Sequence, residues 1–115
     1  MYSKVIYLAS PYNHPDNEVR IENYNKVAKL SAKLVAEGQV VISPIAYGHT
    51  LLDFYENFPY DWEFWENFCI SLLSKSDELL VYKMEGWDKS RGVLSEIDFA
   101  TKKNIPIKFV EYEKN

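Results

Sequence analysis

The sequence contains one cysteine, four glycines and no apolar run long enough to span a bilayer. Because an internal disulfide needs two thiols, the single Cys69 excludes one. Basic residues are also few: 13 lysines and arginines stand against 17 acids, and no basic run is longer than two residues. A chain of this charge has no general attraction for the phosphate backbone of DNA or RNA, so polymeric nucleic acid is not an expected partner.

The first apolar run begins at Val5, which leaves no room for a signal peptide, so we expect a cytoplasmic protein without a membrane partner. At 115 residues the chain is expected to form one domain, residues 1–115, around one core. What the sequence has in excess is aromatic side chains, 16% of the total, concentrated between residues 47 and 68. That density exceeds the needs of one helix face and predicts a pocket or a subunit contact.

Short apolar runs alternate with helical patterns along the whole chain. The runs predict strands at Val5–Ala9, Val40–Ile42, Glu78–Lys83 and Ile105–Val110. Helices are predicted from Asp16 or Asn17 to Gly38, from a cap at Asp61 to Leu73, and from Val93 to near Asn104. This alternation predicts an α/β fold: a doubly wound, flavodoxin- or Rossmann-like parallel sheet of four to five strands with helices on both faces. Residues 45–60 have no clean period and are predicted to be a long functional loop with room for one short helix.

In such a sheet, ligands bind at the carboxyl ends of the strands, where the residues from Gly86 to Ala100 are expected to lie. Gly86 and Gly92 predict a turn between a strand and a helix, and free N–H groups at a helix start favour an anion. Ser90 adds a hydroxyl, and Glu96 projects a carboxylate from one turn into the helix. A carboxylate facing an enclosed sugar can attack it or stabilise an oxocarbenium ion. The alternative is a solvated glutamate on a helix surface.

Four short motifs occur in order: Ile6-Tyr7-Leu8-Ala9-Ser10-Pro11, Val41-Ile42-Ser43-Pro44, Ser76-Asp77, and Gly86-Trp87 followed by Ser90, Gly92, Glu96 and Ala100. With these motifs the chain resembles the nucleoside 2-deoxyribosyltransferase superfamily, and more closely its small phage and bacterial members of uncharacterised function, the DUF1937-like branch. It is similar also to nucleoside 5′-monophosphate N-glycosidases. The resemblance covers nearly the whole chain, although each motif alone is weak.

The resemblance implies specific roles. The glutamate matching Glu96 attacks the anomeric carbon of a nucleoside or promotes attack there, and the tyrosine matching Tyr7 orients it by a hydrogen bond. Tyr7 is otherwise a core aromatic whose buried hydroxyl needs a partner. Ser90 stands where the transferases have aspartate and the monophosphate hydrolases have a phosphate-binding serine, which favours a phosphorylated ligand. Ser10 and Pro11 would shape the floor of the site, and the backbone at Gly92 would help to bind the 5′ end.

One position departs from the family pattern. An acidic residue that touches the sugar or base usually precedes the aspartate matching Asp77 by about two helical turns, and here Cys69 stands near that position. Either Glu66 replaces that acid from one turn earlier, or the chemistry is altered or lost. Cys69 itself is expected to be a core residue on an apolar stripe. The sequence therefore nominates no residue to protonate the leaving group.

Other residues have weaker claims. Asp88 can bind a sugar hydroxyl or cap its own turn, and the aromatic group of Tyr47, Tyr60, Trp62 and Trp65 can stack a base. For Trp65 we favour packing. Arg20 and Arg91 can pair with phosphate or remain exposed charges. His14 and His49 lie near the expected ligand edge without the spacing of metal ligands, so neither a metal nor another cofactor is predicted.

Three functions remain open. The first is an enzyme, a nucleotide N-glycosidase or deoxyribosyltransferase, that cleaves the N-glycosidic bond of a nucleoside or nucleoside 5′-monophosphate. The second is a module that binds a nucleotide or a nucleotide-derived signal without turnover, which the altered position at Cys69 suggests. The third is a structural subunit assembled through its aromatic patch. The resemblance also implies a homo-oligomer.

Overall fold

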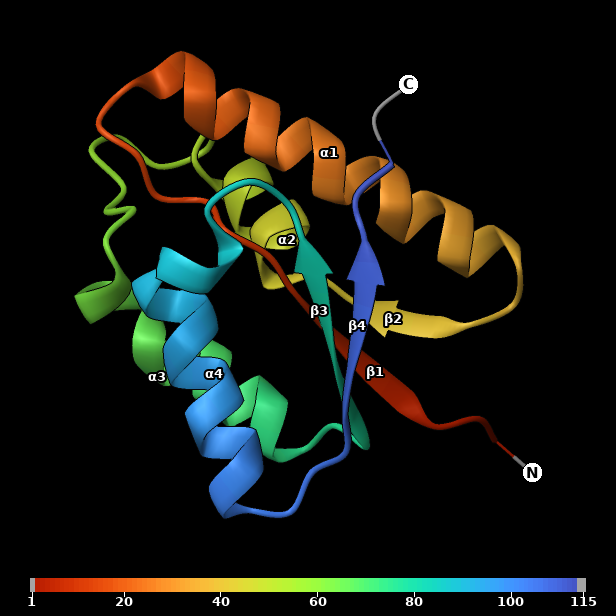
Figure 1. Ribbon diagram of the computed structural model, residues 1–115. Helices are drawn as coiled ribbons and strands as arrows, with labels where there is room; N and C mark the ends of the chain where they lie inside the picture. Colours follow the sequence, from red (N-terminus) through yellow and green to blue (C-terminus); the bar gives the residue numbers. More distant parts are fainter. Residues whose placement is uncertain (1, 114–115) are drawn as a thin grey trace.

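The computed structural model describes residues 2–113, and Figure 1 shows its elements. In chain order these are β1 (Val5–Ala9), α1 (Asn17–Ala36), β2 (Val40–Ile42), α2 (Pro44–Leu51), α3 (Trp62–Ser74), β3 (Glu78–Lys83), the 3₁₀ turn η1 (Trp87–Lys89), α4 (Arg91–Lys102) and β4 (Ile107–Glu111). The strands form one parallel sheet in the order β2-β1-β3-β4. The predicted α/β fold is confirmed, with four strands in the described chain.

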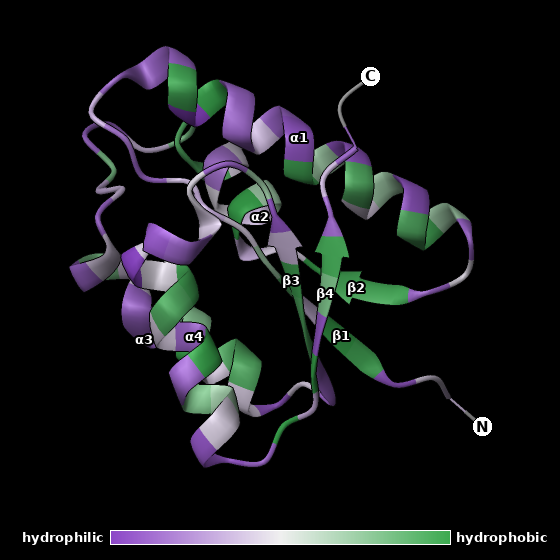
Figure 2. Cartoon of the chain, in the orientation of Figure 1, coloured by the Kyte–Doolittle hydropathy of each residue, from purple (hydrophilic) through white to green (hydrophobic). Residues whose placement is uncertain are grey.

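Helices cover both faces of this sheet, because successive side chains of a strand point to opposite faces. Tyr7 of β1 and Leu79 of β3 pack in a core with Leu73 of α3. Leu8 of β1 packs on the other face with Val27 of α1. Figure 1 shows α1 on one side of the strands and the pair α3 and α4 on the other, and Figure 2 shows hydrophobic residues concentrated along the strands.

The buried face of α1 does not extend to its last turn. Val27 is fully buried, but Val35, in the last turn of α1, is exposed. The adjacent strand β2 has only three residues and lies at the edge of the sheet, so the last turns of α1 have little apolar surface to cover.

The short helix for which the predicted loop at residues 45–60 left room lies at its start. α2 occupies Pro44–Leu51, and Ser43 caps it by accepting a hydrogen bond from the backbone N–H of Ala46 at 3.1 Å. Serine before proline is a strong helix start, because proline has no N–H to satisfy in the first turn. The irregular segment is therefore limited to residues 52–61.

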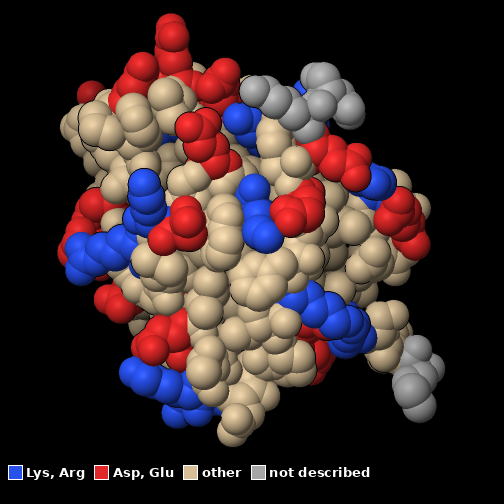
Figure 3. All heavy atoms as spheres, viewed as in Figure 1, with Lys and Arg blue, Asp and Glu red and all other residues tan. Residues whose placement is uncertain are grey.

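The surface carries mixed charge. On the face that Figure 3 shows, acidic and basic side chains are interspersed. Within residues 2–113, the helices are all too short or too polar to cross a membrane.

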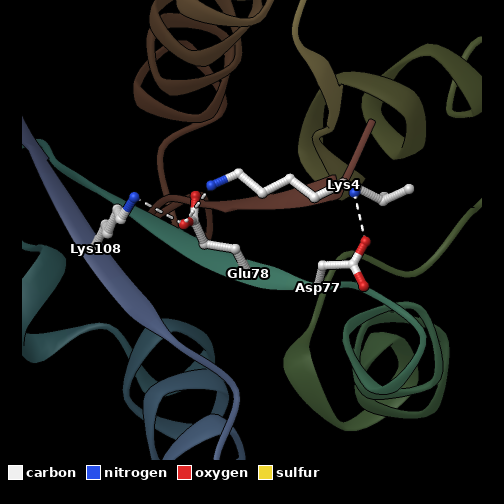
Figure 4. Close-up of polar contacts among 5 residues, drawn as sticks. Lys4, Asp77, Glu78 and Lys108 are labelled. Atoms are coloured by element: carbon white, nitrogen blue, oxygen red, sulfur yellow. Dashed lines mark hydrogen bonds and ion pairs between the residues drawn. The ribbon is translucent and has the colours of Figure 1, made fainter. Parts of the chain in front are cut away.

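The amino ends of the strands carry a polar cluster centred on Glu78 (Figure 4). The Glu78 carboxylate accepts a hydrogen bond from Lys4 Nζ at 3.0 Å and pairs with Lys108 Nζ at 3.1 Å. Its neighbour Asp77 accepts the backbone N–H of Val5 at 2.7 Å. These contacts join β1, β3 and β4 at the end of the sheet away from the predicted ligand edge.

Candidate functional site

A cleft lies at the carboxyl end of β1, between the helical layers of the two sheet faces. Its volume is about 690 Å³ when the open, solvent-filled mouth is included. The structure brings five of the predicted site residues to its lining from the end of β1, from α3 and from α4 with its N-cap: Ser10, Trp62, Ser90, Gly92 and Glu96.

Three helices begin at this cleft. Asp61 caps α3 by accepting the Phe64 N–H at 3.3 Å, and Ser90 caps α4 by accepting the Val93 N–H at 3.3 Å. Both caps line the cleft, as does Pro44 at the start of α2. The amino end of each helix carries a partial positive charge, so the three dipoles together favour an anionic ligand, although the Asp61 carboxylate offsets part of this field.

Glu96 is the most buried acid at the site. It lies on the inner face of α4 with 5% of its surface exposed, so a solvated helix glutamate is excluded. The hydroxyl of Tyr7, which is fully buried, donates a hydrogen bond to Glu96 Oε2. Burial raises the pKa of Glu96 to about 8, and the Tyr7 hydrogen bond acts in the opposite direction. The carboxyl is therefore mostly protonated at neutral pH and close to the pKa that suits proton transfer.

Tyr7 stays neutral for the same reasons. Burial first, and then the charge of Glu96, raise the pKa of Tyr7 well above its usual value. A neutral hydroxyl is a hydrogen-bond donor, so Tyr7 fixes the position of the Glu96 carboxyl without competing for its proton.

Ser10 has an unmatched hydroxyl. Ser10 is buried at the end of β1 and lines the cleft, and its Oγ has no hydrogen-bond partner within residues 2–113. A buried polar group without a partner costs about 1–3 kcal/mol, so a ligand hydroxyl or phosphate oxygen that reached it would recover part of that cost.

Two tryptophans pack tightly against glycines in the cleft wall. A Cβ on Gly92 would lie 3.1 Å from Trp62 Cε3, and one on Gly48 would lie 3.1 Å from Trp65 Cη2. Gly92 is the second residue of α4 and not part of the predicted turn. Its lack of a side chain leaves room for the Trp62 ring. Trp65 also donates its Nε1–H to the Pro59 carbonyl at 2.8 Å, so it packs as predicted.

Comparison with known proteins assigns the chain to a family. Residues 4–113 match the family described as a domain of unknown function, DUF1937. The chain belongs to the DUF1937 family. No curated protein sequence matches it.

The DUF1937 chain is similar to the solved structure of a 2-deoxyribosyltransferase from the psychrotolerant bacterium Bacillus psychrosaccharolyticus, described as a biocatalyst for nucleoside synthesis. The TM-score is 0.66 at 20% sequence identity, over 96% of this chain and 74% of that chain. At this identity the similarity establishes a shared fold. It confirms the predicted resemblance of the DUF1937 protein at that level.

Four of the predicted residues do not reach the cleft of the DUF1937 chain. Glu66 is exposed and lies with Glu63 and Asn67 in an outer groove beside Phe99, because α3 packs against α4 along this side. Glu66 therefore does not replace the missing acid in this structure. Asp88 is exposed on η1 and Pro11 is buried behind Ser10, so neither lines the cleft. Tyr7 also does not line the cleft, but its hydroxyl is hydrogen-bonded to Glu96, which does.

The arginines of the DUF1937 chain have other partners. Arg91 is exposed and forms an ion pair with Glu63. Arg20 is buried, with its guanidinium 4.0 Å from the centroid of the Tyr60 ring, and it donates to Asn17 Oδ1 at 3.1 Å. Neither side chain lines the cleft.

Two cleft residues of the DUF1937 chain were assigned no role in the site by the sequence. Cys69 lines the cleft, and burial, followed by the charge of Glu96, raises the pKa of its thiol to about 12. His49 lines it from α2, with Nδ1 2.7 Å from the Tyr12 hydroxyl. The helix start at Ser43-Pro44 was the signal that could have placed His49 on an ordered wall. Within residues 2–113, no cluster of His, Cys, Asp and Glu side chains is arranged to hold a metal ion.

Proposed function

We propose that this DUF1937 protein cleaves the N-glycosidic bond of a nucleoside or nucleoside 5′-monophosphate and passes the sugar to water or to a second base. The observation that supports it most is Glu96, buried in a cleft and held by Tyr7. A carboxyl group without a cationic partner is costly to bury, and such costs are characteristic of reactive sites. The convergence of three helix N-termini supports an anionic ligand.

In the reaction, Glu96 is the nucleophile or the general base. As nucleophile, its carboxylate attacks C1′, the C1′–N bond breaks, and the electron pair of that bond leaves with the base. Water or a second base then attacks C1′ and releases the carboxylate. Ser90 and the backbone at Gly92 bind the 5′ end where α4 begins, and Ser10 supplies its unpaired hydroxyl to the sugar or the phosphate.

A non-catalytic module that binds a nucleotide is the second candidate. It is favoured by the chemistry at Cys69, which stands near the family's acidic position with a thiol that burial keeps protonated. A thiol is a weak hydrogen-bond donor and does not protonate a leaving base.

The decisive experiment is chromatography of the products after incubation with ribo- and deoxyribonucleosides and their 5′-monophosphates, with and without an acceptor base. Release of free base by the wild type, lost in Glu96→Gln with an unchanged circular dichroism spectrum, supports the enzyme. Equal release by both proteins would refute the role of Glu96. Calorimetric binding of a nucleotide without any base release would favour the binding module.

A further inference from the structure

One wall of the cleft is formed by α2, and no residue of this wall has a role in the reaction proposed above. α2 packs with α1 on one face of the sheet, whereas α4 packs with α3 on the other. The 5′ end is assigned to the start of α4 and the anomeric carbon to Glu96, both on the α4 side. The base of the ligand is therefore expected to contact the remaining lining, which includes His49 of α2 and, in the segment after this helix, Leu52 and Tyr60.

His49 is held rigidly on this wall. The Tyr12 hydroxyl lies 2.7 Å from Nδ1, and the Tyr24 ring is stacked on the imidazole with centroids 4.1 Å apart. The Tyr12 ring meets the imidazole edge-on at 5.7 Å. Two neighbours thus fix the orientation of the ring before any ligand binds.

The neighbours also determine which nitrogen carries the proton. The Tyr12 hydroxyl lies within hydrogen-bonding distance of Nδ1, and burial raises its pKa, so it keeps its proton. A phenolic O–H is a good donor and an unprotonated imidazole nitrogen a good acceptor, so we assign the Tyr12 proton to the hydrogen bond with Nδ1 of His49. Nδ1 is then the acceptor, and the neutral imidazole carries its hydrogen on Nε2.

Nε2 is then a second free donor in the cleft, in addition to the Ser10 hydroxyl. It has no hydrogen-bond partner among residues 2–113. Unlike Ser10 Oγ, it is not fully enclosed, so a ligand can reach it. Burial lowers the pKa of His49; the charge of Asp53 opposes this shift and that of Arg20 adds to it. The ring is therefore neutral at physiological pH and presents an N–H to the ligand.

We propose that His49, positioned by Tyr12, is the hydrogen-bond donor that recognises the nucleobase and stabilises it as it leaves. This inference rests on the proposed function of the same cleft. Purine and pyrimidine rings carry nitrogen and carbonyl acceptors that gain negative charge as the C1′–N bond breaks. A fixed neutral N–H beside such an acceptor stabilises the developing charge. His49 thereby takes over a task for which the Cys69 thiol is unsuited.

The step balances without a further reactant in hydrolysis. The electron pair of the C1′–N bond stays with the base, and a ring acceptor takes a hydrogen bond from His49 Nε2–H, whose proton remains on the imidazole. Water then gives its hydroxyl group to C1′ and its remaining proton to the base. The Glu96 carboxylate is restored.

The test compares two leaving groups. Guanosine or deoxyguanosine 5′-monophosphate, whichever the wild type hydrolyses, is compared with its 7-methyl derivative, whose base departs as a neutral molecule. We expect His49→Ala to lower kcat on the ordinary nucleotide by about 100-fold and on the methylated one by less than about threefold. Tyr12→Phe should give a smaller loss of the same selectivity. His14→Ala is the control, because His14 is the other histidine and lies outside the cleft. It should change kcat on neither the ordinary nor the methylated nucleotide. Equal losses on both substrates, or none, would overturn the proposal.

A binding measurement separates this proposal from the enzymatic one. Adenine is titrated into Glu96→Gln protein labelled with ¹⁵N-histidine, and His14→Ala in that background assigns the signals of the two histidines. We expect the Nε2 resonance of His49 to shift on binding. If the wild type releases no base but the resonance shifts, the glycosidase proposal fails and the base contact stands. No shift at saturating adenine contradicts the base contact.

Discussion

Glu78 and Glu96 are buried to the same extent, each with 5% of its surface exposed, yet they are held in opposite ways. At the amino end of the sheet, burial would raise the pKa of Glu78, but Lys4 and Lys108 outweigh it and lower that pKa. In the cleft, Glu96 has one neutral partner, and its pKa is raised to about 8. Lys4 and Lys108 keep Glu78 charged, whereas burial keeps Glu96 mostly neutral because its partner carries no charge.

The difference separates a carboxylate that joins strands from one that is kept reactive. Glu78 is ionised and bridges β1 and β4 through two lysines. Among the described residues, no cation contacts Glu96. Its ionised form is therefore disfavoured unless a ligand or solvent stabilises the negative charge. Proteins commonly give up stability at functional sites in this way.

The largest contrast is expected in turnover. Glu96→Gln should reduce base release by about a thousandfold or more, because an amide cannot act as nucleophile or base. Glu78→Gln is the matched control: it makes the same chemical change at the same burial and should stay within about threefold of the wild type. Product chromatography on folded protein measures both. Similar losses of base release in the two variants would contradict the role of Glu96 as nucleophile or general base.

The second contrast is in the pH dependence of stability. The unfolded chain releases the Glu96 proton near 4.5, whereas the folded protein keeps it to about 8. The folded state binds more protons in this window, so raising the pH through it lowers the free energy of unfolding. Glu96→Gln removes this contribution and should reduce the loss between about pH 5 and pH 9 by about 2–4 kcal/mol. Urea unfolding across the window tests it, and identical slopes in wild type and variant would contradict the raised pKa.

A third change sharpens the contrast by removing the partner of Glu96. The Tyr7 hydrogen bond favours the ionised carboxyl, so Tyr7→Phe should raise the pKa of Glu96 further. We expect the acid limb of the kcat/KM profile to move to higher pH and the rate at neutral pH to fall by about 10- to 100-fold. A rate loss without movement of the profile would show that Tyr7 acts by position alone.

The smallest effect is expected at Glu78. Its lowered pKa means that its stabilising contribution is present above the usual carboxyl pKa and is lost as the pH falls through the folded value. Glu78→Gln should therefore cost about 1 kcal/mol at neutral pH and less in acid, a modest figure because both lysines are largely exposed. High salt should reduce the difference. A variant destabilised equally at all pH values would point to lost packing.

The fold was predictable because strands buried on both faces leave continuous apolar runs, as at Val5–Ala9 and Glu78–Lys83. The residues at the helix starts in the cleft could also be predicted from the sequence, because Asp61 and Ser90 are residue types that commonly cap helices. α2 was predicted only as room for one short helix, because residues 45–60 have no clean period. The serine before Pro44 was the signal that could have fixed where this helix begins. The outward position of Glu66 depends on how α3 packs against α4, which spacing along one helix does not determine.

The hydrogen bond between Tyr7 and Glu96 closes a span of 89 residues along the chain. It exists only once β1 has entered the sheet beside β3 and α4 has docked on that face, so it forms together with the most non-local contacts of the fold. No fragment that lacks β1 or α4 contains both groups. Base release would then report on completely folded molecules, and partly folded protein would contribute none of it.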